Sequence, residues 1–390
     1  MSNFITEIKI GKVRHLENID IILGNEKKHL ILTGKNGSGK TSVLDALNIR
    51  LEADYYNAFF QERVDKYASQ ELKFILTDSN IEILLKNSLD NYIKKENNDF
   101  IYAYFGAKRE LKTYKSKGIE KIDLLENKTK KLNNDFLQYI VNLKAERSFA
   151  RDDNEEKIVE EIDKWFERFE NILKAIYNDD SLSLKFDRRN IMSYNFVIEK
   201  ENREVFDFHS LSDGYSSILD IITEILLKVE TTKSRGLDVE GIVLIDEIET
   251  HLHVELQKNI LPLLISFFPN IQFIVTTHSP FVLQSIENSI VYDLERKEQL
   301  SGKRLNIASY ADIVKNYFEV DSEFSKVLEN KIIRYEELID SFEKNTLDID
   351  GEKELLHLDI KLDEIAPMMS KNIFLRFKES QDRINNDGKS

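Results

Sequence analysis

The chain has 390 residues, no cysteine and a formal net charge of −15 at pH 7. The lack of cysteine excludes disulfides and thiolate zinc sites, and the acidic balance argues against a general affinity for nucleic acid, because neutralising phosphates requires a basic surface. No apolar run approaches the roughly 18 residues that cross a bilayer, and the N-terminus lacks a charged-then-apolar signal pattern, so we expect a cytoplasmic protein without a membrane segment.

The N-terminal region predicts strands that lead into a glycine-rich loop. Residues 4 to 10 and 18 to 23 alternate or cluster apolar side chains, which predicts two strands of a small antiparallel sheet. The apolar run at 29 to 33 predicts another strand, followed by the loop Gly34–Thr41 (GKNGSGKT) and a helical pattern. A strand, a glycine-rich loop and a helix in this order form the context that a phosphate-binding loop requires.

The chemistry of this loop follows from its glycines and its position before a helix. Glycine permits tight turns that aim backbone N–H groups at phosphate oxygens, and the helix start adds a positive dipole end. We expect Lys40 to reach the β- and γ-phosphates of ATP and the Thr41 hydroxyl to bind Mg²⁺. The predicted nucleotide-binding residues of the loop are Gly34, Lys35, Asn36, Gly37, Ser38, Gly39, Lys40, Thr41 and Ser42.

The next two hundred residues predict further strands and a helical lobe. Residues 119 to 178 are charged and strongly helical, with apolar side chains at helical spacing around Trp165. We interpret Trp165 as a core residue in preference to a base-stacking platform. The other predicted elements are a helix at 41–68, paired strands at 72–88, and strands at 101–105, 182–187, 194–200 and 203–208.

Basic residues gather within this acidic chain. We interpret them as a solvated face with neutralising acids nearby, which leaves nucleic-acid binding open without supporting it strongly. The residues concerned are Lys108, Arg109, Lys112, Lys115, Lys117, Lys128, Lys130 and Lys131, with a second pair at Arg188 and Arg189.

Three later motifs complete the pattern that the loop begins. They are Leu211–Tyr215 (LSDGY), an aliphatic strand that ends in Asp246 and Glu247, and Thr276–Pro280 (TTHSP). Asp246 is expected to hold the metal through water, on the side opposite Thr41. Glu247 is the expected general base, which positions and polarises the attacking water.

The order of these motifs resembles that of the ABC-type ATPase heads in RecF, SMC and overcoming-lysogenization-defect (OLD) proteins. It differs from the order in kinases and small GTPases. Within that group, Asp246–His253 (DEIETHLH) and Tyr104–Arg109 resemble segments of bacterial ATPases in anti-phage systems, such as Septu-like and retron-associated systems. The resemblance covers roughly residues 3 to 50 and 205 to 295.

The resemblance implies a site shared between two chains. Ser212 and Gly214 would contact the γ-phosphate of an ATP held by the loop of a second subunit. His278 would sense the γ-phosphate in its own chain, and residues 249 to 253 would lie at the dimer seam. The Gln-loop of the family is not identifiable, although the sequence offers two candidates, Gln61 and Gln70.

We therefore predict an α/β fold. It is an ABC-type P-loop ATPase head with a mixed central sheet, an antiparallel β subdomain, a helical insertion lobe and a helical C-terminal extension. The short distance between loop and signature excludes a long coiled-coil arm. The predicted boundaries are 1–110 and 206–296 for the two halves of the head, 111–205 for the insertion and 297–390 for the extension.

The C-terminal region predicts a last sheet strand at 290–294, a polar loop at 297–304 and then charged helices. In the OLD group a metal-dependent Toprim nuclease follows the head, and Asp348–Asp350 imitates one of its elements. Because this segment lies between helical patterns, without the expected strand and glutamate before it, we interpret it as a turn between helices.

Three functions from different classes fit these observations. The first is an ATPase that dimerises around two ATP molecules and regulates a separate effector, such as a nuclease, in anti-phage defence. The second is a RecF-like repair ATPase that clamps DNA. The third is an ABC transporter subunit, whose signature normally continues with Gly-Gly-Gln. The acidic charge and the missing nuclease favour the first function.

Overall fold

The structure is a computed structural model that divides into two compact units, Met1–Tyr310 and Ala311–Ser390. Each unit has its own hydrophobic core. The residues that the structure describes are 3–59, 80–89, 99–112, 115–116, 118–122, 124, 131–189, 194–201, 204–232, 237–308, 313, 326–369 and 371–387.

A six-stranded sheet with the order β12-β11-β3-β10-β9-β5 forms the centre of the first unit. Five strands are parallel, and β12 runs antiparallel to β11 at one edge. Every residue of β3, β10 and β11 is buried, which explains their continuous apolar sequences. The strands are β3 (His29–Thr33), β5 (Phe100–Phe105), β9 (Glu240–Ile245), β10 (Ile271–Thr276), β11 (Ser289–Asp293) and β12 (Glu298–Ser301).

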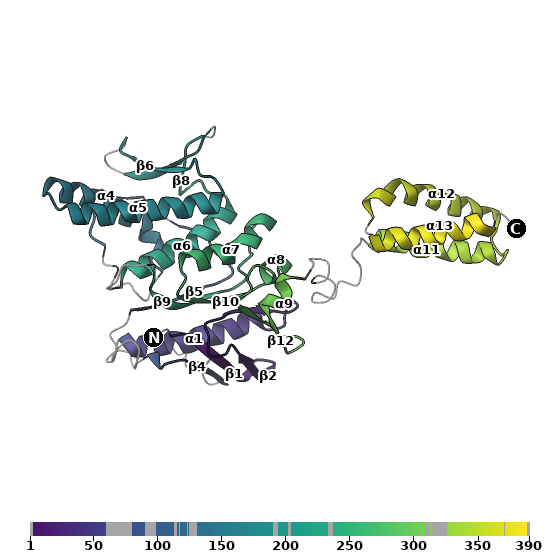
Figure 1. The fold of residues 1–390 in the computed structure, drawn as a ribbon, viewed down its shortest axis with the longest axis horizontal. Helices are drawn as coiled ribbons and strands as arrows, with labels where there is room; N and C mark the ends of the chain where they lie inside the picture. The colour runs from purple at the N-terminus through teal and green to yellow at the C-terminus, as the bar shows by residue number, and fades with distance from the viewer. Residues whose placement is uncertain are drawn as a thin grey trace. The chain divides into compact units, whose positions relative to one another are not determined.

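Helices cover both faces of this sheet. Figure 1 shows α1 on one side of the sheet and α6 and α7 on the other. Helix α6 is buried along most of its length because apolar residues occur on nearly all of its faces. The helices are α1 (Lys40–Phe59), α6 (Asp213–Glu230), α7 (Val254–Phe267), α8 (Pro280–Leu283) and α9 (Gly302–Asn306).

A small antiparallel sheet packs beside α1, as the sequence predicted. Its strands are β2 (Leu16–Ile22), β1 (Ile5–Val13) and β4 (Asn80–Leu85), in that order. Residues of this sheet, α1 and the central sheet form one apolar cluster. The predicted helix beyond residue 59 and the predicted strand before residue 80, together with Gln61 and Gln70, lie outside the described residues, and β4 ends at Leu85.

The sequence prediction of a polar loop at 297–304 is wrong. Strand β12 pairs with β11, and helix α9 follows it directly. The Gln299 side chain fixes this edge by accepting from Ile22 N–H at 3.0 Å and donating to Ile22 O at 2.8 Å. An edge strand held by such polar contacts lacks the apolar alternation that would identify it in a sequence.

The helical lobe consists of a helix pair and a three-stranded antiparallel sheet with the order β6-β7-β8. Trp165 stacks on Phe169 inside this lobe and is 7% exposed, which confirms it as a core residue. Its Nε1 donates to Glu230 at 2.9 Å. The elements are η2 (Asn133–Asp135), α4 (Phe136–Asp152), α5 (Glu156–Tyr177), β6 (Ser183–Asp187), β7 (Asn195–Glu199) and β8 (Phe206–Asp207).

The prediction of helix from residue 119 onward is wrong at its start, because residues 118 to 122 form bends and irregular chain. The described helix begins near Asn133. There the carboxylate of Glu224, on α6, accepts from the backbone N–H groups of Leu132 and Asn133 at 2.6 and 2.9 Å. A tertiary contact therefore fixes where this helical segment begins, and local sequence does not reveal it.

In its described residues, the second unit is a bundle of three helices. Its core contains Tyr335, Leu362 and Phe377. Asp348 lies just before α12 and accepts from Gly351 N–H at 2.7 Å, so the Asp348–Asp350 segment is a helix-capping turn, as interpreted. The elements are α11 (Lys326–Glu343), α12 (Ile349–Ile365), η3 (Ala366–Met368) and α13 (Lys371–Asp387). Within the described parts of the chain, no helix is long and apolar enough to cross a membrane.

Candidate nucleotide-binding site

The loop between β3 and α1 is a tight turn around the start of α1. Gly34, Gly37 and Gly39 have φ angles of 140°, 84° and 96°, which L side chains rarely adopt. Lys40 folds back over the loop, and its Nζ donates to the carbonyls of Gly34 and Lys35 at 2.9 and 3.0 Å. This backbone has the geometry that a phosphate-binding loop requires.

A cavity of about 320 Å³ lies at this loop. Of the predicted loop residues, six line the cavity: Asn36, Gly37, Gly39, Lys40, Thr41 and Ser42. Glu247 and His278 also line it, so segments far apart in the sequence meet here. Gly34, Lys35 and Ser38 are not among the lining residues, and the buried Ser38 Oγ has no hydrogen-bond partner within the described structure.

Two cavity residues were missed by the sequence analysis. Arg14 and His15 lie in the turn between β1 and β2, and both line the cavity. A Cβ at Gly39 would lie 2.8 Å from Leu16 Cδ1 and 3.3 Å from His15 Cε1, so this glycine also lets the turn approach the loop. The two predicted strands, 4 to 10 and 18 to 23, left a wider gap than the structure has, so no sequence signal identified this turn.

Lys40 is a cationic group that lines the cavity, and the whole residue is 6% exposed. Burial lowers the pKa of Lys40, and the carboxylates of Glu247, Glu249 and Asp246 oppose that shift. The ammonium is therefore held among acidic groups at the cavity.

The Thr41 hydroxyl and the Asp246 carboxylate meet at the end of the central sheet. Thr41 Oγ1 donates to Asp246 Oδ2 at 3.0 Å. Hydroxyl and carboxylate oxygens suit Mg²⁺, which proteins usually hold with one or two carboxylates together with substrate phosphates. No cluster of three or more His, Cys, Asp or Glu residues suited to a metal occurs in the described regions. The donor set therefore fits a magnesium ion that a nucleotide also binds.

Thr276, at the end of β10, organises the two acidic residues. Its Oγ1 donates to Asp246 Oδ1 at 2.6 Å and accepts from Glu247 N–H at 2.7 Å. Thr276 belongs to the motif around His278, but that motif does not indicate its contacts with Asp246 and Glu247.

Replacing Thr276 with valine keeps the side-chain shape and removes both hydrogen bonds. We expect the free energy of unfolding to fall by about 1–3 kcal/mol, because a buried carboxylate and a backbone N–H lose their partner. Urea unfolding measures this change. The control is Thr231→Val, whose hydroxyl donates to Lys228 O at the end of α6, with an expected loss of about 0.5 kcal/mol or less. Equal losses in the two variants would contradict the role of Thr276.

Glu247 and His278 approach the cavity from different strands. Glu247 has a φ of 44°, and Thr250 Oγ1 donates to its Oε2 at 3.2 Å. Burial lowers the pKa of His278 and the nearby charge of Lys40 lowers it further, while Glu247 and Asp246 oppose the shift, so the net effect favours the neutral imidazole. Glu249 connects the turn after β9 to the segment after β10 in the same chain. Its carboxylate accepts from Thr277 Oγ1 at 2.7 Å and from His278 N–H at 2.5 Å.

The signature residues lie elsewhere. Ser212 is exposed and precedes α6, whereas Gly214 is buried against the turn that follows β9. Neither residue lines the cavity of its own chain. The structure thus brings together the loop, Asp246, Glu247 and His278 but not the signature.

The described residues of the basic stretch do not form a single exposed face. Lys131 Nζ donates to the buried carboxylate of Asp220 at 2.7 Å. Lys112 pairs with Glu110 at 3.3 Å, as expected for a solvated face with neutralising acids. Lys117, Lys128 and Lys130 lie outside the described residues.

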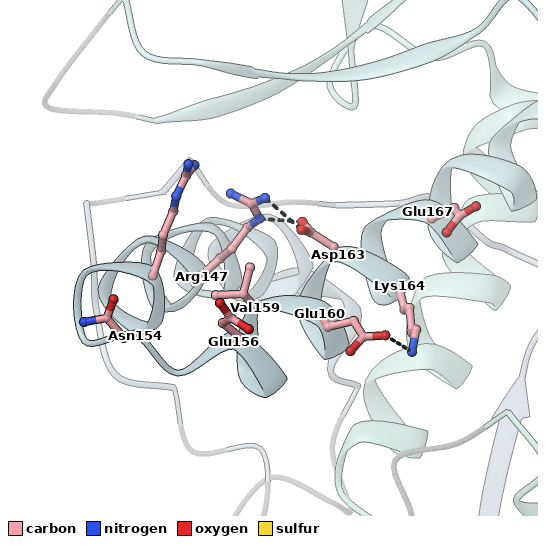
Figure 2. Close-up of a pocket in the computed structure, with 9 residues that line it drawn as sticks. Arg147, Asn154, Glu156, Val159, Glu160, Asp163, Lys164 and Glu167 are labelled. Atoms are coloured by element: carbon pink, nitrogen blue, oxygen red, sulfur yellow. Dashed lines mark hydrogen bonds and ion pairs between the residues drawn. The ribbon is translucent and has the colours of Figure 1, made fainter.

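A second cavity, of about 810 Å³, lies along the α4–α5 hairpin (Figure 2). Its lining carries charges of both signs. Figure 2 shows Arg147 of α4 paired with Asp163 of α5, and Lys164 Nζ donates to Glu160 at 2.7 Å. Because these charges pair with one another and lie apart from the motifs, we do not assign this cavity to the nucleotide.

The chain is similar in sequence to known bacterial proteins. The chain is 28% identical over 314 residues to the Septu protein PtuA of Bacillus mycoides (strain KBAB4), covering 76% of this chain and 41% of that protein. It is 36% identical over 146 residues to the "Retron Ec83 probable ATPase" of Escherichia coli, covering 35% of this chain and 26% of that protein. The predicted resemblance to Septu and retron ATPases is confirmed, although this chain spans less than half of the length of either relative.

A solved structure of an SMC head bound to the C-winged helix domain of ScpA matches with a TM-score of 0.43 and 14% identity, over 77% of this chain and 99% of that chain. Residues 69–284 match the family described as "AAA domain, putative AbiEii toxin, Type IV TA system". This region starts after the phosphate loop and contains the signature, Asp246, Glu247 and His278. Because the match covers more than half of the sequence, the chain belongs to this AAA-domain family.

Proposed function

We propose that this chain is a Mg²⁺-dependent ATPase that dimerises around two ATP molecules and regulates a separate effector, such as a nuclease, in anti-phage defence. One observation carries the ATPase assignment. Lys40, Thr41, Glu247 and His278 line one cavity, and Asp246 bonds to Thr41 at its edge. These are the groups that phosphate binding, metal binding and activation of water require.

The chain's own residues have distinct roles in this proposal. Lys40 would bind the β- and γ-phosphates, while Thr41 and Asp246 would hold the metal. Mg²⁺, when bound, neutralises charge that develops on the phosphates. Glu247, oriented by Thr250, accepts the proton of the attacking water on a carboxylate oxygen. Neutral His278 donates a hydrogen bond to the γ-phosphate.

The proposed dimer rests on the position of the signature. Ser212 is exposed and does not line the cavity of its own chain. In a head-to-tail dimer this serine would complete the site of the other chain, as the resemblance to ABC-type heads implies. ATP binding would then assemble the dimer, and hydrolysis would release it.

The separate effector is proposed because the described residues of the second unit form helices without the strand and acidic pattern of a Toprim nuclease. Asp348 caps α12 and Asp350 lies in the first turn of that helix, where its carboxylate pairs with Lys353 at 3.3 Å. Neither aspartate is placed after a strand, as an element of a Toprim nuclease would be.

The purified chain with ATP and Mg²⁺ or Mn²⁺ is expected to hydrolyse nucleotide and to leave plasmid DNA and RNA intact. Phosphate release and gel electrophoresis measure the two activities in one sample. Absence of ATP hydrolysis would contradict the ATPase assignment. Nucleic-acid cleavage that disappears in Asp348→Ala and Asp350→Ala variants would overturn the proposal of a separate effector and restore an OLD-like nuclease.

A further inference from the structure

Arg109 lies on the segment that follows β5. It contacts the turn that follows β9, residues 246 to 252. It is 5% exposed, and its guanidinium contacts backbone carbonyls. Nη1 donates to Asp246 O at 2.5 Å and to Gly106 O at 2.9 Å, and Nη2 donates to Glu247 O at 2.8 Å. The planar, rigid fork of arginine can satisfy several such acceptors at once, which a lysine cannot reproduce.

The turn that Arg109 contacts has a strained backbone. Glu247 and His251 have φ angles of 44° and 66°, in the left-handed region that non-glycine residues rarely adopt. Such conformations persist where the surrounding structure determines them. Here the Glu247 N–H is held by Thr276, and its carbonyl is held by Arg109. The backbone of the proposed general base is therefore fixed on both sides.

Arg109 also connects this turn to the signature helix α6. Its Nε donates to Ser217 Oγ at 3.1 Å, and Ser217 is 1% exposed within α6. The start of α6 contacts the same turn directly, because a Cβ at Gly214 would lie only 3.0 Å from His251 O. Two independent contacts thus join α6 to the residues around Glu247.

We propose that Arg109 is a positioning residue that transmits displacement of α6 to the backbone of Glu247. This inference rests on the proposed function, in which α6 of one chain meets the ATP held by the other chain. Nucleotide at the partner's loop would move α6, and Arg109 and the Gly214 contact would shift Glu247 in the same chain. ATP bound at one site would therefore set the catalytic geometry of the other site.

Three variants separate this role from a purely structural one. Arg109→Lys keeps the positive charge and loses the planar fork. Ser217→Ala removes the hydroxyl that links Arg109 to α6 and leaves the arginine in place. Thr223→Val is the matched control, since it removes a buried hydroxyl from the same helix, where Thr223 Oγ1 donates to Leu219 O at 2.6 Å within α6.

Two measurements on the full chain test the proposal. The first is amide hydrogen exchange of residues 246 to 252, with and without ATP. We expect Arg109→Lys to speed this exchange by about tenfold, the effect of losing one charge-assisted hydrogen bond. We expect Ser217→Ala to reduce the change in exchange that ATP causes in the wild-type turn, because only the Gly214 contact then joins α6 to the turn. Thr223→Val should behave as wild type.

The second measurement is steady-state ATP hydrolysis across ATP concentrations. We expect Arg109→Lys to lower kcat by about tenfold while KM changes by less than about threefold, because the proposed role concerns Glu247 and not nucleotide binding. Ser217→Ala should lower the Hill coefficient for ATP relative to the wild-type chain, while the Gly214 contact still joins α6 to the turn. The inference would be overturned if amide exchange in the turn were the same in Arg109→Lys, Ser217→Ala and Thr223→Val. This outcome would hold whatever the rate of ATP hydrolysis. A wild-type chain that hydrolyses no ATP would instead overturn the proposed function.

Discussion

Replacing Glu247 with glutamine is expected to leave ATP binding intact and to slow hydrolysis by a factor on the order of a hundred or more. Glutamine preserves the size of the side chain and can still accept the hydrogen bond from Thr250. It cannot take the proton of the attacking water. Because the nucleotide would then stay bound, we expect the ATP-bound dimer to persist.

The rate is measured by single-turnover hydrolysis and the affinity for ATP by titration. Sedimentation velocity measures the fraction of the chain that is dimeric. Glu255→Gln provides the control, because Glu255 is an exposed carboxylate in the first turn of α7. That variant should hydrolyse ATP at the wild-type rate. Wild-type hydrolysis by the Glu247→Gln chain would show that another group activates the water.

Lys40→Ala and Ser212→Arg chains are each expected to be inactive alone and active when mixed. Loss of the Lys40 ammonium should weaken ATP binding by roughly a hundredfold or more, because charge-assisted contacts to the phosphates are lost. Arginine at 212 should block the partner's site by its bulk. In a mixed dimer, the intact loop of one chain faces the intact signature of the other, so one complete site remains.

Random mixing should restore about a quarter of the wild-type activity, because half of the dimers are mixed and each has one of two sites. The control replaces the Lys40→Ala chain with a chain that carries both substitutions, which leaves every composite site defective. Phosphate release from the two mixtures compares them directly. A fully active Ser212→Arg homodimer would contradict a site shared between chains.

The parts of the site that sequence predicts best are those that lie at strand ends. Asp246 follows β9, Thr276 ends β10, and the phosphate loop follows β3. These parallel strands are neighbours in the sheet, so the sheet alone brings the three segments together. The apolar runs that identify such strands are strong signals because both faces are buried. Apolar residues at helical spacing likewise identified Trp165 as a core residue of the helical lobe.

The parts that sequence did not predict depend on contacts between backbone groups and distant side chains. Arg109 binds carbonyls, which every residue possesses, so no partner residue type identifies its role. Arg14 reaches the cavity from a turn, and β12 is an edge strand without apolar alternation. The start of the helical segment near Asn133 depends on Glu224, about ninety residues later.

The strand order of the central sheet has a consequence for synthesis of the protein on the ribosome. Strand β3, which carries the phosphate loop, lies between β10 and β11, which are made more than two hundred residues later. At roughly 5–20 residues per second, the interval from β3 to β11 takes on the order of tens of seconds. During that time the nascent loop lacks both of its neighbouring strands, so an unfinished chain that stops before β10 cannot build the nucleotide site.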